Sequence, residues 1–181
     1  MSSELRIAIS GKSGCGNSTV SGIVAERLGV KLINYTFKSV ASELGVSFEE
    51  VCQRAENDSK FDLLVDRRQI AMAEEGSCVL GSRLAIWLLK SANLTVHLEA
   101  SVEVRAQRIQ RREGGELDAT LSDTLGRDAR DRDRYKKLYD IDIDEFDFAD
   151  LKIDAETLGP NQIADVIIHN VNQKLDHPRT I

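Results

Sequence analysis

Short apolar runs of four to six residues recur along the chain, separated by longer stretches whose apolar residues follow a helical period. Runs this short and rich in β-branched residues are typical of strands that are buried on both faces. The predicted strands are Leu5–Ser10, Lys31–Asn34, Cys78–Gly81, Leu94–Leu98 and Leu151–Asp154. Because strands and helices alternate, the pattern predicts an α/β fold in which one five-stranded parallel sheet is flanked by helices.

The stretches between the runs predict the helices. Residues 36 to 75, between the second and third strands, form an all-helical insertion, within which Ser47-Phe48-Glu49-Glu50 has the form of a capping box. Ser101 is expected to cap the helix that precedes Gly114-Gly115, and Pro160 suits the first turn of the last helix. The other helices are expected at Ser18–Leu28, Val102–Arg112, Leu117–Tyr139 and Pro160 to about Lys174.

The bulk composition is that of one globular domain. A chain of 181 residues with 41% apolar and 30% charged residues fits a single α/β domain. Its net charge of −6 argues against binding a nucleic-acid polymer, and no apolar run is long enough to span a membrane. The first residues lack the form of a signal peptide, and the three cysteines lie far apart without metal-ligand spacing. These features predict a cytoplasmic protein and leave its oligomeric state open.

A glycine-rich loop between the first strand and the first helix fits a phosphate-binding loop, or P-loop, at every position but one. Residues 11 to 19 are Gly11, Lys12, Ser13, Gly14, Cys15, Gly16, Asn17, Ser18 and Thr19. The backbone N–H groups of such a loop bind phosphate oxygens, and the following helix N-terminus favours the same negative charge. Asn17 stands where the P-loop pattern requires lysine, so the loop predicts a nucleotide site without its usual positive charge.

Arginines are concentrated on the two helices on either side of Gly114-Gly115. Three on each helix share a face by their spacing: Arg105, Arg108 and Arg112 on the first, and Arg127, Arg130 and Arg134 on the second. Guanidinium groups bind phosphate oxygens bidentately, so two such faces joined at a glycine hinge suit a lid over phosphates, spanning about residues 105 to 134. Interspersed acidic residues leave an alternative, in which these are solvated helix faces.

Four segments, in order along the chain, carry a resemblance to a known family. They are the P-loop, Gly81-Ser82-Arg83-Leu84-Ala85, the run from Arg127 to Tyr135 (RDARDRDRY), and LYDID at 138–142 with LKID at 151–154. Together they span nearly the whole chain and resemble the cytidylate kinases, in their short form from archaea and some bacteria. The resemblance implies a P-loop kinase fold, with residues 36–75 as the insertion that binds the nucleoside monophosphate. It also implies transfer of the γ-phosphoryl group of ATP to CMP or dCMP.

The resemblance also implies a role for each matching residue. The P-loop residues Gly11 to Thr19 would hold the phosphates of ATP, with the Ser18 hydroxyl on Mg²⁺. Lys38 and Arg83 would bind the acceptor phosphate. The residues implied to act on the transferring group from the lid side are Arg127 and Arg134, with Asp131 orienting the acceptor or a neighbouring arginine.

Three positions depart from the family pattern. Asn17 removes a charge, which Lys12 is a candidate to replace. Gly81 stands where relatives tend to have a carboxylate near the metal. Leu84 stands where the longer bacterial cytidylate kinases have an aspartate that helps to read cytosine. These departures keep two alternatives open: a degenerate nucleotide-binding protein with weak or no kinase activity, and a P-loop kinase for another small molecule.

Overall fold

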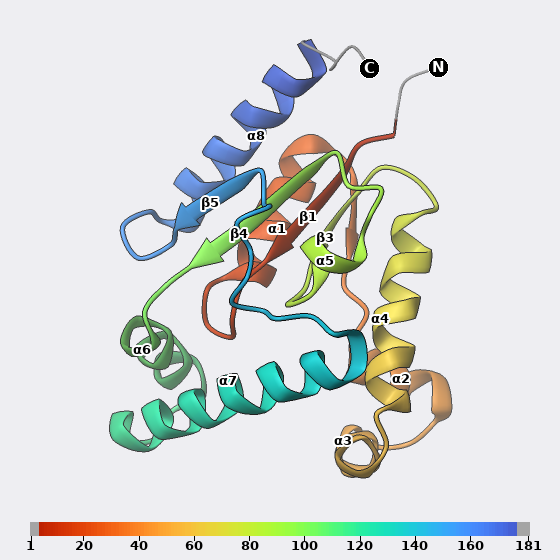
Figure 1. Ribbon diagram of the computed structural model, residues 1–181, viewed down its shortest axis with the longest axis vertical. Helices are drawn as coiled ribbons and strands as arrows, with labels where there is room; N and C mark the ends of the chain where they lie inside the picture. Colours follow the sequence, from red (N-terminus) through yellow and green to blue (C-terminus); the bar gives the residue numbers. More distant parts are fainter. Residues whose placement is uncertain (1–3, 177–181) are drawn as a thin grey trace.

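All five predicted strands are present in the computed structural model, which describes residues 4–176, and each ends within one residue of its predicted limits. They are β1 (Arg6–Ser10), β2 (Lys31–Ile33), β3 (Cys78–Gly81), β4 (Leu94–Glu99) and β5 (Leu151–Asp154). The strands pair in parallel in the order β2-β3-β1-β4-β5 (Figure 1). The five-stranded parallel sheet is thus confirmed, and β1, which leads into the P-loop, is its central strand.

The helices also follow the sequence pattern closely. They are α1 (Asn17–Leu28), α2 (Phe37–Leu44), α3 (Phe48–Asn57), α4 (Lys60–Ala73), α5 (Ala85–Leu88), α6 (Val102–Glu113), α7 (Leu117–Tyr139) and α8 (Pro160–Asp176). Ser101 caps α6, as expected, by accepting a hydrogen bond from the Val104 N–H at 3.4 Å. The insertion between β2 and β3 consists of α2, α3 and α4.

The capping box predicted at Ser47 is only half correct. The Ser47 hydroxyl accepts a hydrogen bond from the Glu50 N–H at 3.1 Å, as a box requires. The Glu50 carboxylate, however, pairs with Arg54 one turn further along α3, because the i,i+4 cation competes with the backbone N–H. A reciprocal box is found instead at the start of α2, between Thr36 and Ser39.

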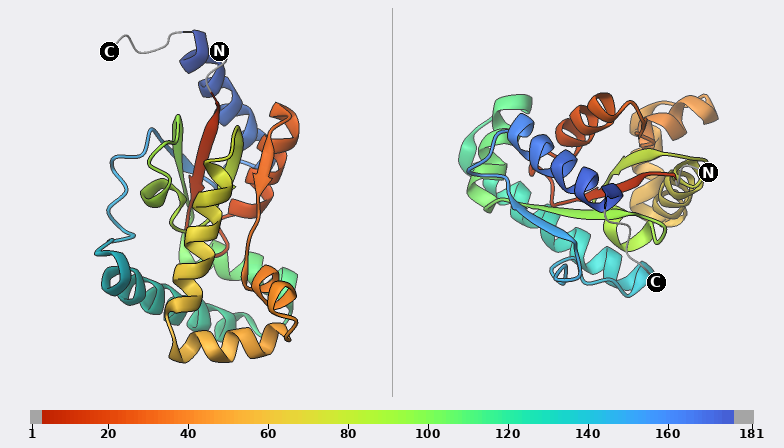
Figure 2. Two further views of the ribbon diagram at one scale, coloured as in Figure 1. Left: turned by 90° about the vertical axis from the view of Figure 1, so that its right-hand side faces the viewer. Right: turned by 90° about the horizontal axis from the view of Figure 1, so that it is seen from above.

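Helices cover both faces of the sheet (Figure 2). On one face α1 and α8 pack together over a core that includes Ile7, Ile9, Val24, Val96 and Ile167. On the other face the core includes Ala8, Leu80, Trp87, Tyr135 and Ile143, contributed by the strands, α5, α7 and the segment that follows α7. No helix within residues 4–176 is long and apolar enough to cross a membrane.

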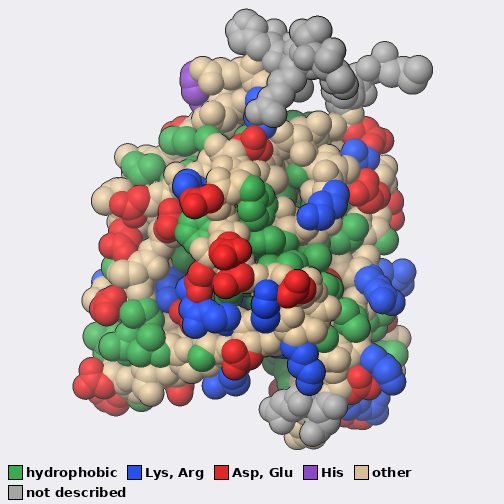
Figure 3. Space-filling model, viewed as in Figure 1, with side chains coloured by type: hydrophobic (Ala, Val, Ile, Leu, Met, Phe, Trp, Pro, Cys, Tyr) green, Lys and Arg blue, Asp and Glu red, His purple; other side chains and the backbone are tan. Residues whose placement is uncertain are grey.

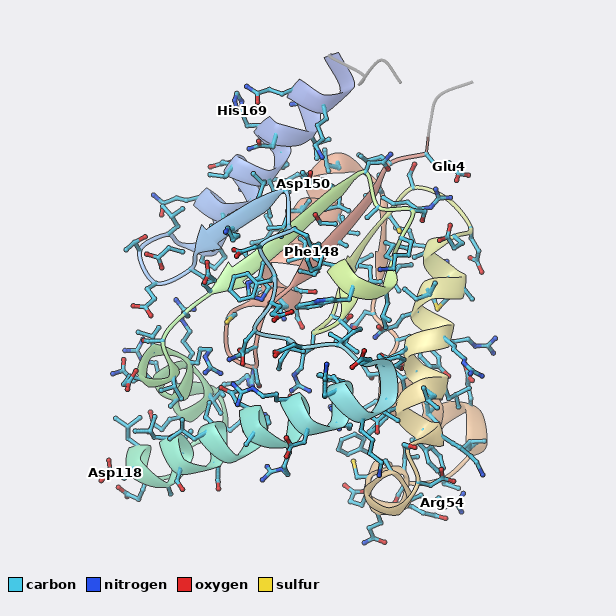
Figure 4. The ribbon with its side chains drawn as sticks, in the orientation of Figure 1. Glu4, Arg54, Asp118, Phe148, Asp150 and His169 are labelled. Atoms are coloured by element: carbon cyan, nitrogen blue, oxygen red, sulfur yellow. The ribbon has the colours of Figure 1, made fainter. Side chains whose placement is uncertain are left out.

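The arrangement gathers the predicted site at one end of the sheet. α7 runs across the carboxyl ends of the strands, with α6 at one side and α2, α3 and α4 at the other (Figure 1). In Figure 4 the labels Asp118, on α7, and Arg54, on α3, mark the two sides of this end. The segment after α7 returns along the sheet, and acidic and basic side chains gather over it (Figure 3). Parallel α/β sheets bind their ligands at the carboxyl ends of the strands, so this is the end to search for a site.

Candidate active site

The P-loop has the backbone conformation that its glycines were expected to allow. Gly14 and Gly16 have φ angles of +88° and +102°, which residues with a side chain rarely adopt. A Cβ on Gly14 would also lie 2.9 Å from the carbonyl oxygen of Arg105, so the loop packs directly against α6. Gly16 ends the loop as the N-cap of α1. The loop therefore points backbone N–H groups and a helix N-terminus into one space, which is an anion-binding arrangement.

A cavity of about 710 Å³ opens over this loop. Its walls come from the P-loop, the ends of β2 and β3, helix α6 and the segment between β5 and α8. The lining residues include Lys12–Val20, Asn34, Thr36, Gln69, Gly81–Arg83, Arg108, Arg112 and Ala155–Pro160. Ser18 and Thr19 are exposed in it, whereas the Cys15 side chain is buried and burial raises the pKa of its thiol. A triphosphate laid on the loop would thus meet backbone and hydroxyl donors.

Asn17 does not reach outward from the loop as a P-loop lysine does. Its Nδ2 donates a hydrogen bond to the Gly11 carbonyl at 2.6 Å, which ties the two ends of the loop together. Its Oδ1 is buried and has no hydrogen-bond partner among the described residues. The side chain at this position therefore serves the shape of the loop and brings no positive charge to the phosphates.

Lys12 lies in the same loop and is held by an ion pair. Its Nζ is 2.6 Å from Asp144 Oδ1, and Arg132 pairs with the other oxygen of that carboxylate. Partial burial opposes the charge on Asp144, but Lys12 and Arg132 outweigh it and lower the pKa of Asp144. The Asp142–Glu145 segment is thus a salt-bridged turn that anchors the P-loop to the segment after α7. Lys12 also lines the cavity that opens over the P-loop.

A cluster of two arginines and two carboxylates lies beside the loop. Arg83 Nε is 3.2 Å from Asp131 Oδ2, and Arg134 Nη2 is 2.8 Å from Asp131 Oδ1. Arg134 Nη1 is in turn 3.4 Å from Asp62 Oδ1 on α4. Asp131 is buried, at 6% exposure, while both arginine side chains are about one-third exposed. The cluster brings Arg83, Asp131 and Arg134 together from segments far apart in sequence, with the guanidinium groups accessible to an anion.

A second cavity, of about 240 Å³, begins at this cluster. It is lined by Tyr35, Thr36, Phe37, Asp62, Val65, Asp66, Gln69, Ser82, Arg83, Leu84, Arg134 and Tyr135. Thr36, Gln69, Ser82 and Arg83 line this cavity and the larger one alike. The two cavities therefore adjoin, and Arg83 stands where they meet.

The arginines of α6 and α7 differ in what they contact and in whether they line a cavity. Arg127 Nη1 donates to Ser13 Oγ at 3.1 Å, and Arg108 donates to the Gly14 carbonyl at 3.4 Å, so both reach the P-loop. Arg108 lines the larger cavity, whereas Arg127 lines neither cavity. Arg105 was expected to share a phosphate-facing surface with Arg108, but it is 3% exposed and pairs with Asp128 at 2.6 Å. That expectation is wrong for Arg105, because packing of α7 against α6 covers it.

Lys38 lies apart from the other predicted residues. It is exposed near the start of α2, with its Nζ 5.7 Å from the centre of the Phe48 ring, and it lines neither cavity. In contrast, Asp62, Asp66 and Gln69 line the second cavity but were not predicted from the sequence. Their spacing of four and three residues on one helical face is a signal that could have found them.

Comparison with solved structures supports the fold. The chain resembles a shikimate kinase from Bacteroides thetaiotaomicron with a TM-score of 0.63 at 16% identity, over 96% of this chain and 99% of that one. With the P-loop and the adjoining cavities, this places the molecule in the class of P-loop kinase folds.

The sequence comparisons identify the family. Residues 7–138 match the AAA domain family. The chain is 43% identical to cytidylate kinase 2 of Borreliella burgdorferi over 174 residues, covering 94% of this chain and 97% of the relative. It is 39% identical to the cytidylate kinase of Archaeoglobus fulgidus over 173 residues, covering 94% and 96%. The chain belongs to the cytidylate kinase family.

Proposed function

We propose that this chain transfers the γ-phosphoryl group of ATP to CMP or dCMP, giving ADP and CDP or dCDP. The observation that carries the proposal is the pair of adjoining cavities with Arg83 in their shared wall. One cavity contains the P-loop and suits a triphosphate, and the smaller one suits a nucleoside monophosphate. The relatives named cytidylate kinase support cytidine nucleotides as the acceptor.

In this proposal, catalysis consists of positioning and charge neutralisation. P-loop N–H groups bind the β- and γ-phosphates, and Arg83 binds the acceptor phosphate close to them. Arg127 and Arg134, from α7, would offset the negative charge on the oxygens of the migrating phosphoryl group. Asp131 fixes Arg83 and Arg134 in place through its two oxygens. Holding donor and acceptor in line supplies most of the rate gain, so no covalent intermediate is required.

Mg²⁺ is expected to arrive with ATP. Among the described residues no group of three or more His, Cys, Asp or Glu side chains suits a metal ion. The exposed Ser18 hydroxyl in the first turn of α1 is an oxygen ligand of the kind Mg²⁺ accepts, and phosphates and water complete such sites. The ion would offset phosphate charge, and Ser18 would be its protein ligand.

The direct test is ADP release from Mg·ATP with CMP, dCMP, UMP and AMP each offered as the acceptor. We expect release to depend on the acceptor and to be fastest with CMP or dCMP. Release that no monophosphate accelerates, in a protein that still binds ATP, would instead favour a nucleotide-binding protein without kinase activity. Release that depends on a different phosphate acceptor would reassign the substrate.

Lys12 is proposed to supply the positive charge that Asn17 lacks. On binding of ATP, its Nζ would exchange Asp144 for a phosphate oxygen. A charge-assisted hydrogen bond to phosphate is worth on the order of 1.5–3 kcal/mol, so Lys12→Ala is expected to lower kcat/KM for ATP about ten- to a hundredfold. Asp144→Asn removes the same ion pair but leaves the lysine, and should change this constant only a few-fold. If the two variants behave alike in steady-state kinetics, Lys12 serves the ion pair alone.

A further inference from the structure

Two carboxylates of the smaller cavity have no role in the reaction as proposed so far. Asp62 and Asp66 lie four residues apart on α4, so they share one face of that helix, and both line the cavity. The cavity also contains apolar walls from Phe37, Val65 and Leu84. A half-apolar cavity with a few polar groups fits a nucleobase, whose faces are apolar and whose edges form hydrogen bonds.

The two carboxylates differ in what already binds them. Asp62 is 3.4 Å from Arg134 Nη1 and so belongs to the arginine cluster that faces the phosphate. Among residues 4–176, Asp66 forms no ion pair with an arginine, although the charge of Arg134 acts on it from beyond ion-pair distance. Within the described part of the chain, its side-chain hydrogen bond is the one that the Tyr139 hydroxyl donates to Oδ2 at 2.6 Å. This bond fixes the carboxyl group and favours its ionised form, in opposition to burial, which raises the pKa of Asp66.

The Asp66 carboxylate is therefore held in one orientation, and it can accept further hydrogen bonds from a ligand. An ionised carboxylate accepts hydrogen bonds at both oxygens and donates none. The arginines of the same cavity are donors only, and Leu84 is apolar and buried. A ligand N–H₂ group that enters the cavity away from the arginine cluster would meet Asp66 as its acceptor.

We propose that Asp66 determines base specificity by accepting a hydrogen bond from the 4-amino group of cytosine. This inference rests on the proposed function, because it assumes that the acceptor nucleoside occupies this cavity. Uracil has a carbonyl oxygen at the same ring position, which would place two acceptors against each other. Pairing of a carboxylate with the cytosine amino group is a known mode of base recognition. Specificity thus comes from α4, whereas Leu84, after the acceptor-binding Arg83, offers no polar group.

The first experiment compares kcat/KM for CMP and for UMP in the wild type and in Asp66→Asn. In Asp66→Asn the amide oxygen takes the position that accepts the hydrogen bond from Tyr139. The amide NH₂ group then faces the base and can donate to the 4-carbonyl oxygen of uracil. We expect the CMP-to-UMP ratio to fall about five- to a hundredfold, partly through faster use of UMP. Glu49→Gln, an exposed carboxylate-to-amide change on α3, is the matched control and should leave the ratio unchanged.

The second experiment changes the substrate instead of only the protein. Pyrimidin-2-one riboside monophosphate lacks the 4-amino group of CMP. The wild type should use it about five- to a hundredfold less well than CMP, whereas Asp66→Ala should use the two about equally. This comparison within one variant does not depend on how much of that variant is folded.

The outcomes separate this inference from the proposed function. If the wild type prefers CMP to UMP and Asp66→Asn keeps that preference, the proposed function stands and Asp66 does not read the base. Equal use of CMP and UMP by the wild type would also overturn the assignment of Asp66. If the wild type phosphorylates no monophosphate, the proposed function itself fails.

Discussion

Replacing Arg83 by Ala is expected to lower kcat/KM for CMP about a thousandfold while KM for ATP changes little. Arg83 lies in the wall shared by the two cavities, so its guanidinium group can contact the acceptor phosphate next to the P-loop. Two charge-assisted hydrogen bonds from one guanidinium group to a phosphate, at about 1.5–3 kcal/mol each, correspond to about 10²–10⁴ in kcat/KM. Because the P-loop backbone remains intact, ATP binding should persist. Initial rates at varied CMP and at varied ATP separate the two effects.

Two further variants and the melting temperature serve as controls. Arg83→Lys keeps the charge but loses the planar fork, and should recover only part of the rate. Arg27→Ala removes an arginine whose exposed ion pair with Asp165 lies on α1 and α8, and should behave as the wild type. Asp131 keeps Arg134 as a partner in Arg83→Ala, so the melting temperature should fall only modestly. A wild-type KM and kcat for CMP in Arg83→Ala would refute the assigned role.

The sheet could be predicted from sequence because its signals are local. Runs such as Cys78–Gly81 are short, apolar and bounded by helical stretches, which leaves few alternatives to a buried parallel strand. The P-loop was equally visible, since Gly14 and Gly16 must adopt positive φ angles. The resemblance to cytidylate kinases then identified Arg83, Asp131 and Arg134, which the fold brings within one cluster.

Contacts between distant segments could not be predicted in the same way. Helical spacing places Arg105 and Arg108 on one face of α6, but only the packing of α7 decides that Arg105 is buried against Asp128. The ion pair between Lys12 and Asp144 joins residues more than a hundred positions apart and leaves no local pattern. The hydrogen bond from Tyr139 to Asp66 is of the same kind. The residues that the sequence analysis missed or misplaced therefore depend on tertiary packing.

Gly81 shows how a departure from a family pattern can have a packing cause. A Cβ at this position would lie 2.2 Å from Ser21 Oγ and 2.8 Å from Ser21 Cβ, on α1. Ser21 is 1% exposed, and its hydroxyl has no hydrogen-bond partner among the described residues. The Ser21 side chain thus fills the space that a carboxylate at position 81 would need. The two positions are expected to be coupled, so that neither can be interpreted alone.

Gly81→Asp is accordingly expected to destabilise the fold by about 2–4 kcal/mol and to lower the melting temperature by about 5–15 °C. Ser21→Gly alone should destabilise the fold by about 1 kcal/mol or less. A glycine inside a helix is unfavourable, but the loss of a buried hydroxyl without a partner offsets part of this cost. The double variant should regain most of the stability lost in Gly81→Asp, because both clashing atoms of Ser21 are gone. Ser21→Ala combined with Gly81→Asp removes the hydroxyl but keeps the Ser21 Cβ at 2.8 Å, so it should restore only part of the lost stability.

Thermal unfolding followed by circular dichroism measures all four variants on one scale. Additive effects of Gly81→Asp and Ser21→Gly would mean that the new side chain avoids Ser21 by another route, and the packing explanation would fail. Non-additive rescue would show that Ser21 excludes a carboxylate from this edge of the P-loop. The rescued double variant would then carry that carboxylate in a stable fold. Its ADP release with CMP would measure what a carboxylate at position 81 adds to the reaction.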